Sequence, residues 1–138
     1  MTAFNDIETA LDSHLNDMAL LPDVAWANAG YEPTIGMMYL RPTFIPGETE
    51  AAALGAEAQD ITIGLYQIDI YAESGRGQNE IIEMADKIAN QFKRGSVLTY
   101  NGVNVRVVRV SRGPAYNADG WFVLPVTITF NTFTDART

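Results

Sequence analysis

The chain has 138 residues, 47% hydrophobic and 19% charged, which fits one globular domain over residues 1–138 and excludes a disordered chain. It has no cysteine, which excludes disulfides, thiol catalysis and thiolate metal sites. The net charge of −8 disfavours tight binding to nucleic acid, because proteins that bind a duplex carry a basic face.

The charge is unevenly distributed along the chain. Residues 1–86 hold fifteen of the seventeen acidic residues and two of the nine basic ones, a net charge of −13, whereas residues 87–138 carry +5. Two interpretations stay open. The two halves neutralise each other inside one fold, or an acidic face of one copy meets a basic face of the next, as a head-to-tail ring requires.

The N-terminal residues carry apolar side chains at steps of three and four, which predicts a helix that starts after Thr2 and ends before Pro22. Its apolar face consists of Phe4, Ile7, Leu11, Leu15 and Met18. His14, the only histidine, lies at the edge of this face. We interpret it as a packed helix residue, because its neighbours Ser13 and Asp17 do not form a catalytic triad with it.

Two strands are predicted next, over residues 24–28 and 37–41, and Pro42 and Pro46 mark where regular strand pairing should stop. Residues 47–59 show no strand periodicity and are predicted to form the tip of a long hairpin. This segment is either a surface loop or a contact arm that orders on assembly. Under the second hypothesis its candidate assembly residues are Glu48, Glu50, Leu54 and Glu57.

Residues 60–72 predict a long strand whose apolar residues change phase halfway. Ile61, Ile63 and Leu65 share one face, and Tyr66, Ile68 and Ile70 share the other. Either a bulge near residues 64–66 re-aims the chain, or the strand extends beyond its own core and another copy covers the second half.

Residues 103–112 repeat this phase change, with Val103, Val105 and Val107 on one face and Val108 and Val110 on the other. The overhang hypothesis gives a candidate oligomer interface of Tyr66, Ile68, Ile70, Val108, Arg109 and Val110. On this hypothesis Tyr66→Asp or Ile68→Asp leaves a folded monomer and blocks ring formation.

A second helix is predicted before Gly95, with its apolar face formed by Ile81, Met84, Ala85, Ile88 and Phe92. Asn101-Gly102 is typical of a type I′ hairpin turn, and residues 113–120 have the composition of a loop. The last strand, residues 121–133, has a buried row of Phe122, Leu124, Val126, Ile128 and Phe130. Pro125 predicts that the donor side of this strand is free at that point.

This order of elements predicts an α+β fold. We expect a mostly antiparallel sheet of five or six strands, two helices packed on one face, and a long loop at a hairpin tip.

The sequence offers little catalytic chemistry, so we expect no enzyme, catalytic residue, cofactor or metal site. The carboxylates of Asp69, Glu73 and Asp86 are more typical of a solvated edge than of a divalent-ion site. The alternative is a small ligand-binding or enzymatic domain, with an aromatic pocket of Trp26, Tyr31 and Tyr39.

Several strings, in this order, resemble the phage tail terminator and minor tail proteins of long, non-contractile-tailed phages. They are MYLR at 38–41, GLYQIDIY at 64–71, GRG at 75–77, the helix that ends at Phe92, and GWFVLPV at 120–126. The resemblance covers nearly the whole chain.

The resemblance implies a virion protein, assembled in the host cytoplasm, that forms a ring, typically a hexamer, on the head-proximal end of the tail tube and ends tube polymerisation. Its implied partners are other copies of itself, the tail tube protein and the head–tail connector protein. DNA passes through the lumen without specific binding, and acidic residues of segment 47–60 or of the first helix are hypothesised to line it. Another neck or tail role, such as head–tail joining, is the alternative within the same class.

Overall fold

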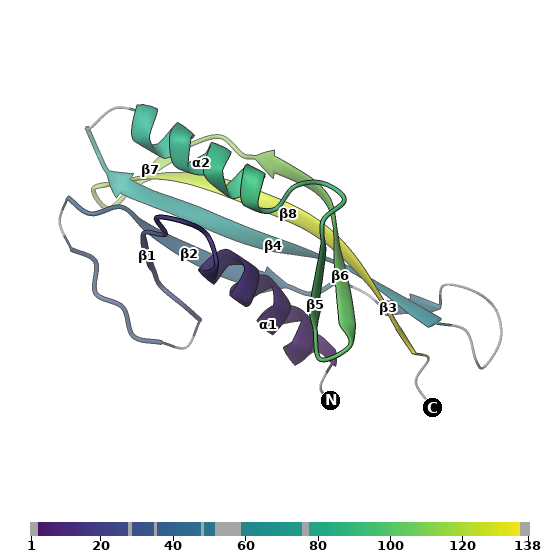
Figure 1. Cartoon of the computed structure of the whole chain (residues 1–138). Helices are drawn as coiled ribbons and strands as arrows, with labels where there is room; N and C mark the ends of the chain where they lie inside the picture. Colours follow the sequence, from purple (N-terminus) through teal and green to yellow (C-terminus); the bar gives the residue numbers. More distant parts are fainter. Residues whose placement is uncertain are drawn as a thin grey trace.

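The computed structural model describes residues 3–27, 29–34, 36–47, 49–51, 59–75 and 78–135. Two helices, α1 (Ala3–Asn16) and α2 (Asn79–Gln91), accompany eight strands in these ranges (Figure 1). The strands are β1 (Asp23–Val24), β2 (Tyr39–Ile45), β3 (Thr49–Ala51), β4 (Gln59–Glu73), β5 (Val97–Tyr100), β6 (Val103–Arg112), β7 (Tyr116–Ala118) and β8 (Trp121–Asp135).

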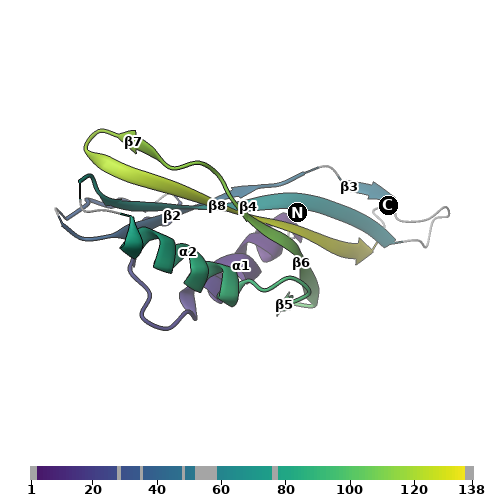
Figure 2. The same ribbon diagram turned by 90° about the horizontal axis from the view of Figure 1, so that it is seen from above.

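The strands form one sheet in the order β1-β2-β4-β8-β6-β5, with β3 also paired to β4 and β7 to β8. β1 pairs with β2 in parallel and the other described pairs are antiparallel, so the sheet is mixed. Both helices lie on the same side of the sheet (Figure 2). The predicted α+β fold with two helices on one face is therefore confirmed, with the parallel β1 as the exception to antiparallel pairing.

The core lies between the helices and the sheet face that they cover, which we call the inner face. α1 contributes Ile7, Leu11 and Leu15, and α2 contributes Ile81 and Ile88, all buried as their helical spacing predicts. α1 ends at Asn16, before the proline that was expected to end it, and Leu20 adopts a φ of 56° in the turn that follows.

His14 links the ends of the two helices. Its Nε2–H donates to the carbonyl oxygen of Gln91 at 2.5 Å, and the Gln91 side-chain amide donates to the His14 carbonyl oxygen at 2.6 Å. The imidazole also meets the Phe92 ring edge-on, with centroids 4.9 Å apart. The interpretation of His14 as a packed helix residue is confirmed.

β4 and β8 form the central ribbon of the sheet. They pair over fifteen consecutive residues, from Gln59↔Asp135 to Glu73↔Trp121, without a register shift. β4 therefore has no bulge. Its even-numbered residues face the helices and its odd-numbered residues face the opposite side, which we call the outer face.

The register corrects half of the predicted oligomer interface. Tyr66, Ile68 and Ile70 are each 0% exposed on the inner face, where α1 and α2 cover them. Another copy cannot contact them, because the chain's own helices already do. The uncovered apolar residues belong to the first half of the strand instead.

In β6 a bulge absorbs the phase change. Val107 pairs with Phe130 and Arg109 with Thr129, so Val108 is the extra residue. The shift returns Val110 to the inner face, opposite Ile128, where it packs against the core. It also places Arg109 on the outer face with Arg106, whereas strict alternation along a strand would put residues 106 and 109 on opposite faces.

Other strand boundaries differ from the predictions for identifiable reasons. β2 continues through Pro42 to Ile45. The backbone nitrogen of Pro42, like the backbone polar groups of Leu40, points away from β4, so pairing with β4 needs no N–H donor at Pro42. Part of the expected loop 47–59 is strand β3, and part of the expected loop 113–120 is strand β7. The Asn101-Gly102 turn is confirmed, with φ of 51° and 79°.

Pro125 lies where β8 changes neighbours. β6 ends opposite Val126 and β7 begins opposite Val123, so the ring faces the gap between the two strands. The backbone N–H of Gly113 donates to the Pro125 carbonyl oxygen at 3.0 Å in this gap. The predicted free donor side is thus confirmed, although the strand is central rather than at the edge.

Candidate functional site at the uncovered end of the sheet

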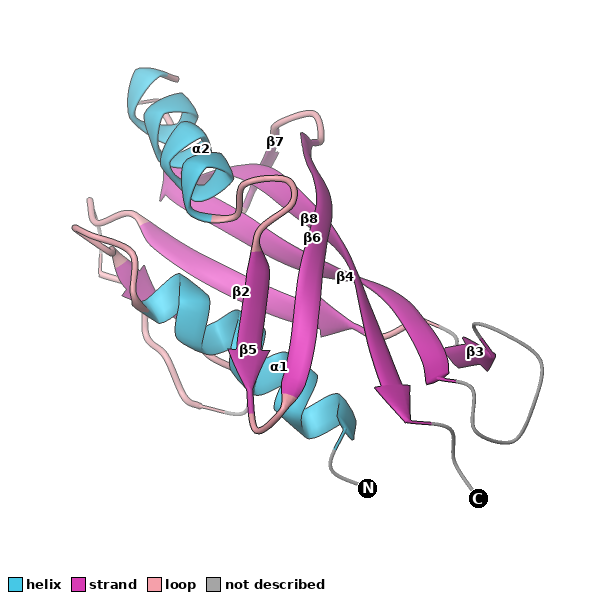
Figure 3. Ribbon diagram, turned by 45° about the vertical axis from the view of Figure 1, so that its right-hand side comes forward, coloured by secondary structure: helices cyan, strands magenta, loops and turns pink. Residues whose placement is uncertain are grey.

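One end of the sheet extends beyond both helices (Figures 1 and 2). It consists of β3, residues 59–65 of β4, residues 129–135 of β8, and Ile45 at the end of β2, and we call it the arm. The β5–β6 hairpin, which runs from the end of α2 to α1, lies beside it (Figure 3). The arm is the part of the sheet that the helices do not cover.

The inner face of the arm is closed by its own close packing. Gly64 lies against the Phe130 ring, since a Cβ there would be 2.7 Å from Phe130 Cζ and 2.9 Å from the Ile45 carbonyl oxygen. Thr62 and Thr132 are also buried, and Thr132 Oγ1 donates to the Asn104 carbonyl oxygen at 2.5 Å. No large side chain is left exposed on this face among the described residues of the arm.

The outer face of the arm carries exposed apolar side chains. Ile63 is 49% exposed, Phe133 46% and Ile45 40%. Register places them together, because Phe133 pairs with Ile61 and Ile45 with Leu65. Exposed apolar surface that is contiguous is often where interaction sites lie, so we take this face as the candidate site.

Two arginines border this apolar surface on the β6 side. Arg106 pairs with Asn131 and Arg109 with Thr129, both on the outer face, and both arginines are exposed. Neither has a hydrogen-bond or ion-pair partner in the part of the chain that the structure describes. The Asn131 side-chain oxygen lies between them and Ile63, and it is buried with no hydrogen-bond partner among the described residues. The outer face thus combines an apolar centre with unpaired hydrogen-bonding groups.

Of the remaining predicted interface residues, Val108 is half-buried at the bulge and Val110 packs at the edge of the core. The assembly residues Glu48, Leu54 and Glu57 lie outside the described residues. Glu50 belongs to β3 and pairs with Ile61, which places it on the arm. Whether these residues contact another copy stays a prediction.

The other end of the outer face is covered by an aromatic cluster. The rings of Tyr39 and Tyr71 stack with centroids 4.6 Å apart, Trp121 meets Tyr39 edge-on at 5.2 Å, and Tyr31 lies 5.0 Å from Tyr39. Trp26 is not part of it. The predicted aromatic pocket of Trp26, Tyr31 and Tyr39 is therefore wrong, because the tyrosines pack against each other and against Trp121.

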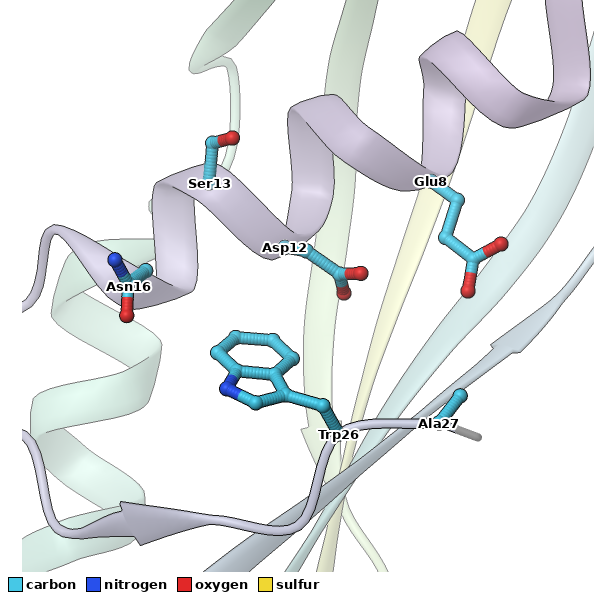
Figure 4. Close-up of a pocket in the computed structure, with 6 residues that line it drawn as sticks. All are labelled: Glu8, Asp12, Ser13, Asn16, Trp26 and Ala27. Atoms are coloured by element: carbon cyan, nitrogen blue, oxygen red, sulfur yellow. The ribbon is translucent and has the colours of Figure 1, made fainter. Parts of the chain in front are cut away.

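Trp26 instead forms one wall of an open groove beside α1 (Figure 4). The groove has a volume of about 360 Å³ and is lined by Glu8, Asp12, Ser13, Asn16, Trp26 and Ala27. The Glu8 and Asp12 side chains leave the same side of α1, over the segment that carries Trp26 (Figure 4).

Asp12 is tied to the core through Tyr66, whose buried hydroxyl donates to its carboxylate. Burial raises the pKa of Asp12 above its ordinary value of 3.8, the hydrogen bond from Tyr66 opposes this rise, and the charge of Glu8 adds to it. Burial and the same carboxylate raise the pKa of Tyr66. The hydroxyl therefore stays protonated and acts as the donor.

The described residues bring together no group of three or more His, Cys, Asp or Glu that could hold a metal ion. Asp69 lies on the outer face and accepts from the Gln67 amide at 2.9 Å, while Asp86 lies on α2 and faces Arg112 at 3.9 Å. Among the described helices, none is long and apolar enough to cross a membrane.

The exposed apolar arm, bordered by Arg106 and Arg109, is the candidate site. A family model described as phage tail terminator protein matches residues 6–130, and the chain belongs to that family. A solved structure is similar to this chain with a TM-score of 0.67 and 25% identity, and the match covers 93% of this chain and 91% of that one. No curated protein matches the chain.

Family membership makes this protein a structural component of a phage tail, and hence of the virion. Sequence analysis identified the family but missed two surfaces: the outer face of the arm and the Glu8–Asp12–Trp26 groove. The first had a signal in the Ile61, Ile63, Leu65 row. The second had none, since it joins α1 to a segment that begins ten residues after Asn16.

Proposed function

We propose that the chain, as one domain, forms a ring of copies, a hexamer, that caps the head-proximal end of the tail tube and ends its polymerisation. The family assignment supports the place in the tail. The ring is supported by one observation, the exposed row of Ile45, Ile63 and Phe133 on the arm. Burying such a row against a neighbouring copy gains about 25 cal/mol per Å² of apolar surface.

The ring contact is of the head-to-tail kind, because the arm of one copy meets a different surface of the next. The tail tube protein binds one side of the ring and the head–tail connector protein the other. DNA passes through the lumen without specific binding, which the net charge of −8 favours. The ring assembles in the host cytoplasm together with the tail.

The experiment compares the same substitution at two exposed isoleucines, Ile63 and Ile82. Ile63→Asp changes the arm, and Ile82→Asp changes the solvent side of α2, where Ile82 is 38% exposed. Tail tube protein is polymerised with each full-length variant, and electron microscopy gives the tube lengths and the rings at tube ends. We expect wild type and Ile82→Asp to give capped tubes of limited length, and Ile63→Asp to give longer, uncapped tubes.

Two results overturn the proposal. Wild-type protein that neither forms rings nor limits tube length excludes the terminator role. Rings bound only to connector, and never to the tube, indicate head–tail joining instead.

A further inference from the structure

We propose that the groove of Glu8, Asp12 and Trp26 receives the guanidinium of Arg109 from a neighbouring copy. This inference rests on the proposed ring and identifies the surface that the arm meets. The groove and the arginine lie on opposite sides of the sheet, so an arginine cannot reach the groove of its own chain.

The groove has the chemistry that binds a guanidinium. It offers two carboxylates on one side of α1 and an indole on the opposite wall, in an open volume of about 360 Å³. Arginine pairs with carboxylates through its planar fork of N–H donors and stacks on aromatic faces, so this combination favours Arg over Lys.

The two carboxylates differ in how their side chains are held. Asp12 is held in place by the hydroxyl of the buried Tyr66. Glu8 has no hydrogen-bond or ion-pair partner among the described residues, and its negative charge acts on Asp12. One acceptor is therefore positioned before binding and the other is free to close on a cation.

The β6 bulge supplies the reason for choosing Arg109. The extra residue, Val108, moves Arg109 from the inner to the outer face, next to the apolar surface of the arm. Bulges often re-aim a side chain in this way. Arg112, after the same bulge, faces α2 and the carboxylate of Asp86, so it is already engaged.

Arg109 and the apolar row share one face, so a neighbour that covers Ile63 also reaches Arg109. The distribution of charge fits this contact, since α1 belongs to the half of the chain with −13 and β6 to the half with +5. Charge complementarity of this kind fixes the register of an interface.

The test exchanges the two charges. Glu8→Arg and Arg109→Glu are made singly and together in the full-length chain, with Glu83→Arg on the exposed side of α2 as the matched control. Circular dichroism checks that each variant folds. Native mass spectrometry and tube capping then measure assembly.

We expect each single variant to assemble about tenfold more weakly or worse, and the double variant to recover most of the loss. A 1:1 mixture of the two single variants should also recover, because an even-numbered ring can alternate them so that every contact joins opposite charges. Glu83→Arg should assemble like wild type.

The outcomes separate the two proposals. Wild-type rings together with a fully assembling Glu8→Arg overturn the groove contact and leave the ring intact. If that variant also retains DNA in the lumen, the α1 acids line the passage instead. Single variants that fail without recovery in the mixture overturn the pairing of these two residues. Wild type that never assembles overturns the ring and this contact together.

Discussion

Tyr66→Phe tests how α1 is fastened to the sheet. The ring is fully buried and the substitution keeps it, so the variant loses only the hydroxyl that donates to Asp12. A hydrogen bond to a charged group contributes about 1.5–3 kcal/mol. Because Asp12 is only half-buried and water enters the groove beside it, we expect a loss of about 1–2 kcal/mol at pH 7.

Asp12→Asn supplies the second side of the cycle. Its amide oxygen still accepts from Tyr66, and no charge needs to be buried, so this variant should be at least as stable as wild type at neutral pH. In the Asp12→Asn background Tyr66→Phe should lower the free energy of unfolding by less, about 0.5–1.5 kcal/mol, because the acceptor is neutral. The difference between the two costs measures the charged part of the bond.

The pH dependence has a defined sign. Because the pKa of Asp12 is raised above 3.8, the folded state holds this proton more tightly than the unfolded state. The contribution of Asp12 is therefore most favourable at low pH and becomes a penalty as pH rises from 3.8 through the raised pKa. The gain in unfolding free energy from Asp12→Asn should be largest at pH 8 and decrease as the pH is lowered.

Urea unfolding followed by tryptophan fluorescence gives these free energies of unfolding. Two results would refute the reasoning. The first is a loss of unfolding free energy below about 0.3 kcal/mol for Tyr66→Phe. The second is an equal loss for Tyr66→Phe in the wild-type and Asp12→Asn backgrounds, because a charged acceptor should make the loss larger in wild type.

The remaining predictions concern single residues of the sheet. Ile68→Asp should give an unfolded protein, as measured by circular dichroism, because burying an unpaired carboxylate costs several kcal/mol. Ile63→Asp should leave the melting temperature nearly unchanged, because Ile63 is exposed. Gly64→Ala should cost about 1–3 kcal/mol in urea unfolding, since the new Cβ meets Phe130 and the Ile45 carbonyl, and Gly30→Ala, with nothing within 4 Å, is its control. Arg112→Ala should change stability by less than about 0.5 kcal/mol, because its pair with Asp86 is 3.9 Å long and 48% and 67% exposed.

The helices and the hairpins were predictable because their signals are local. The apolar spacing of Ile81, Ile88 and Phe92 can be recognised within a single helix, without knowledge of what it packs against. The Asn101-Gly102 turn is determined by those two residues. The family followed from short strings in a fixed order. Local patterns do not give partners, and so β3 and β7, which exist only because β4 and β8 run beside them, were expected to be loops.

The two phase changes show the same limit more sharply. In β4 and in β6 the sequence has the same pattern, yet β4 keeps its register and β6 has a bulge. Pairing decides between them. β4 keeps a continuous fifteen-residue register with β8, whereas β6 follows β8 only as far as Val126 before the chain turns away. The uncovered apolar residues were therefore assigned to the wrong half of β4.

The arm is packed by its own residues, so its outer face is formed without a helix on the inner side. Two strands alone are marginally stable in water, but here β3 adds a third strand and Gly64 allows Phe130 to pack against the backbone, with the Phe44 ring 5.9 Å away. The inner face is therefore held without a helix above it. In the proposed ring, an arm that is already packed in this way loses little conformational entropy on binding, so more of the energy from covering Ile45, Ile63 and Phe133 would remain as affinity between copies.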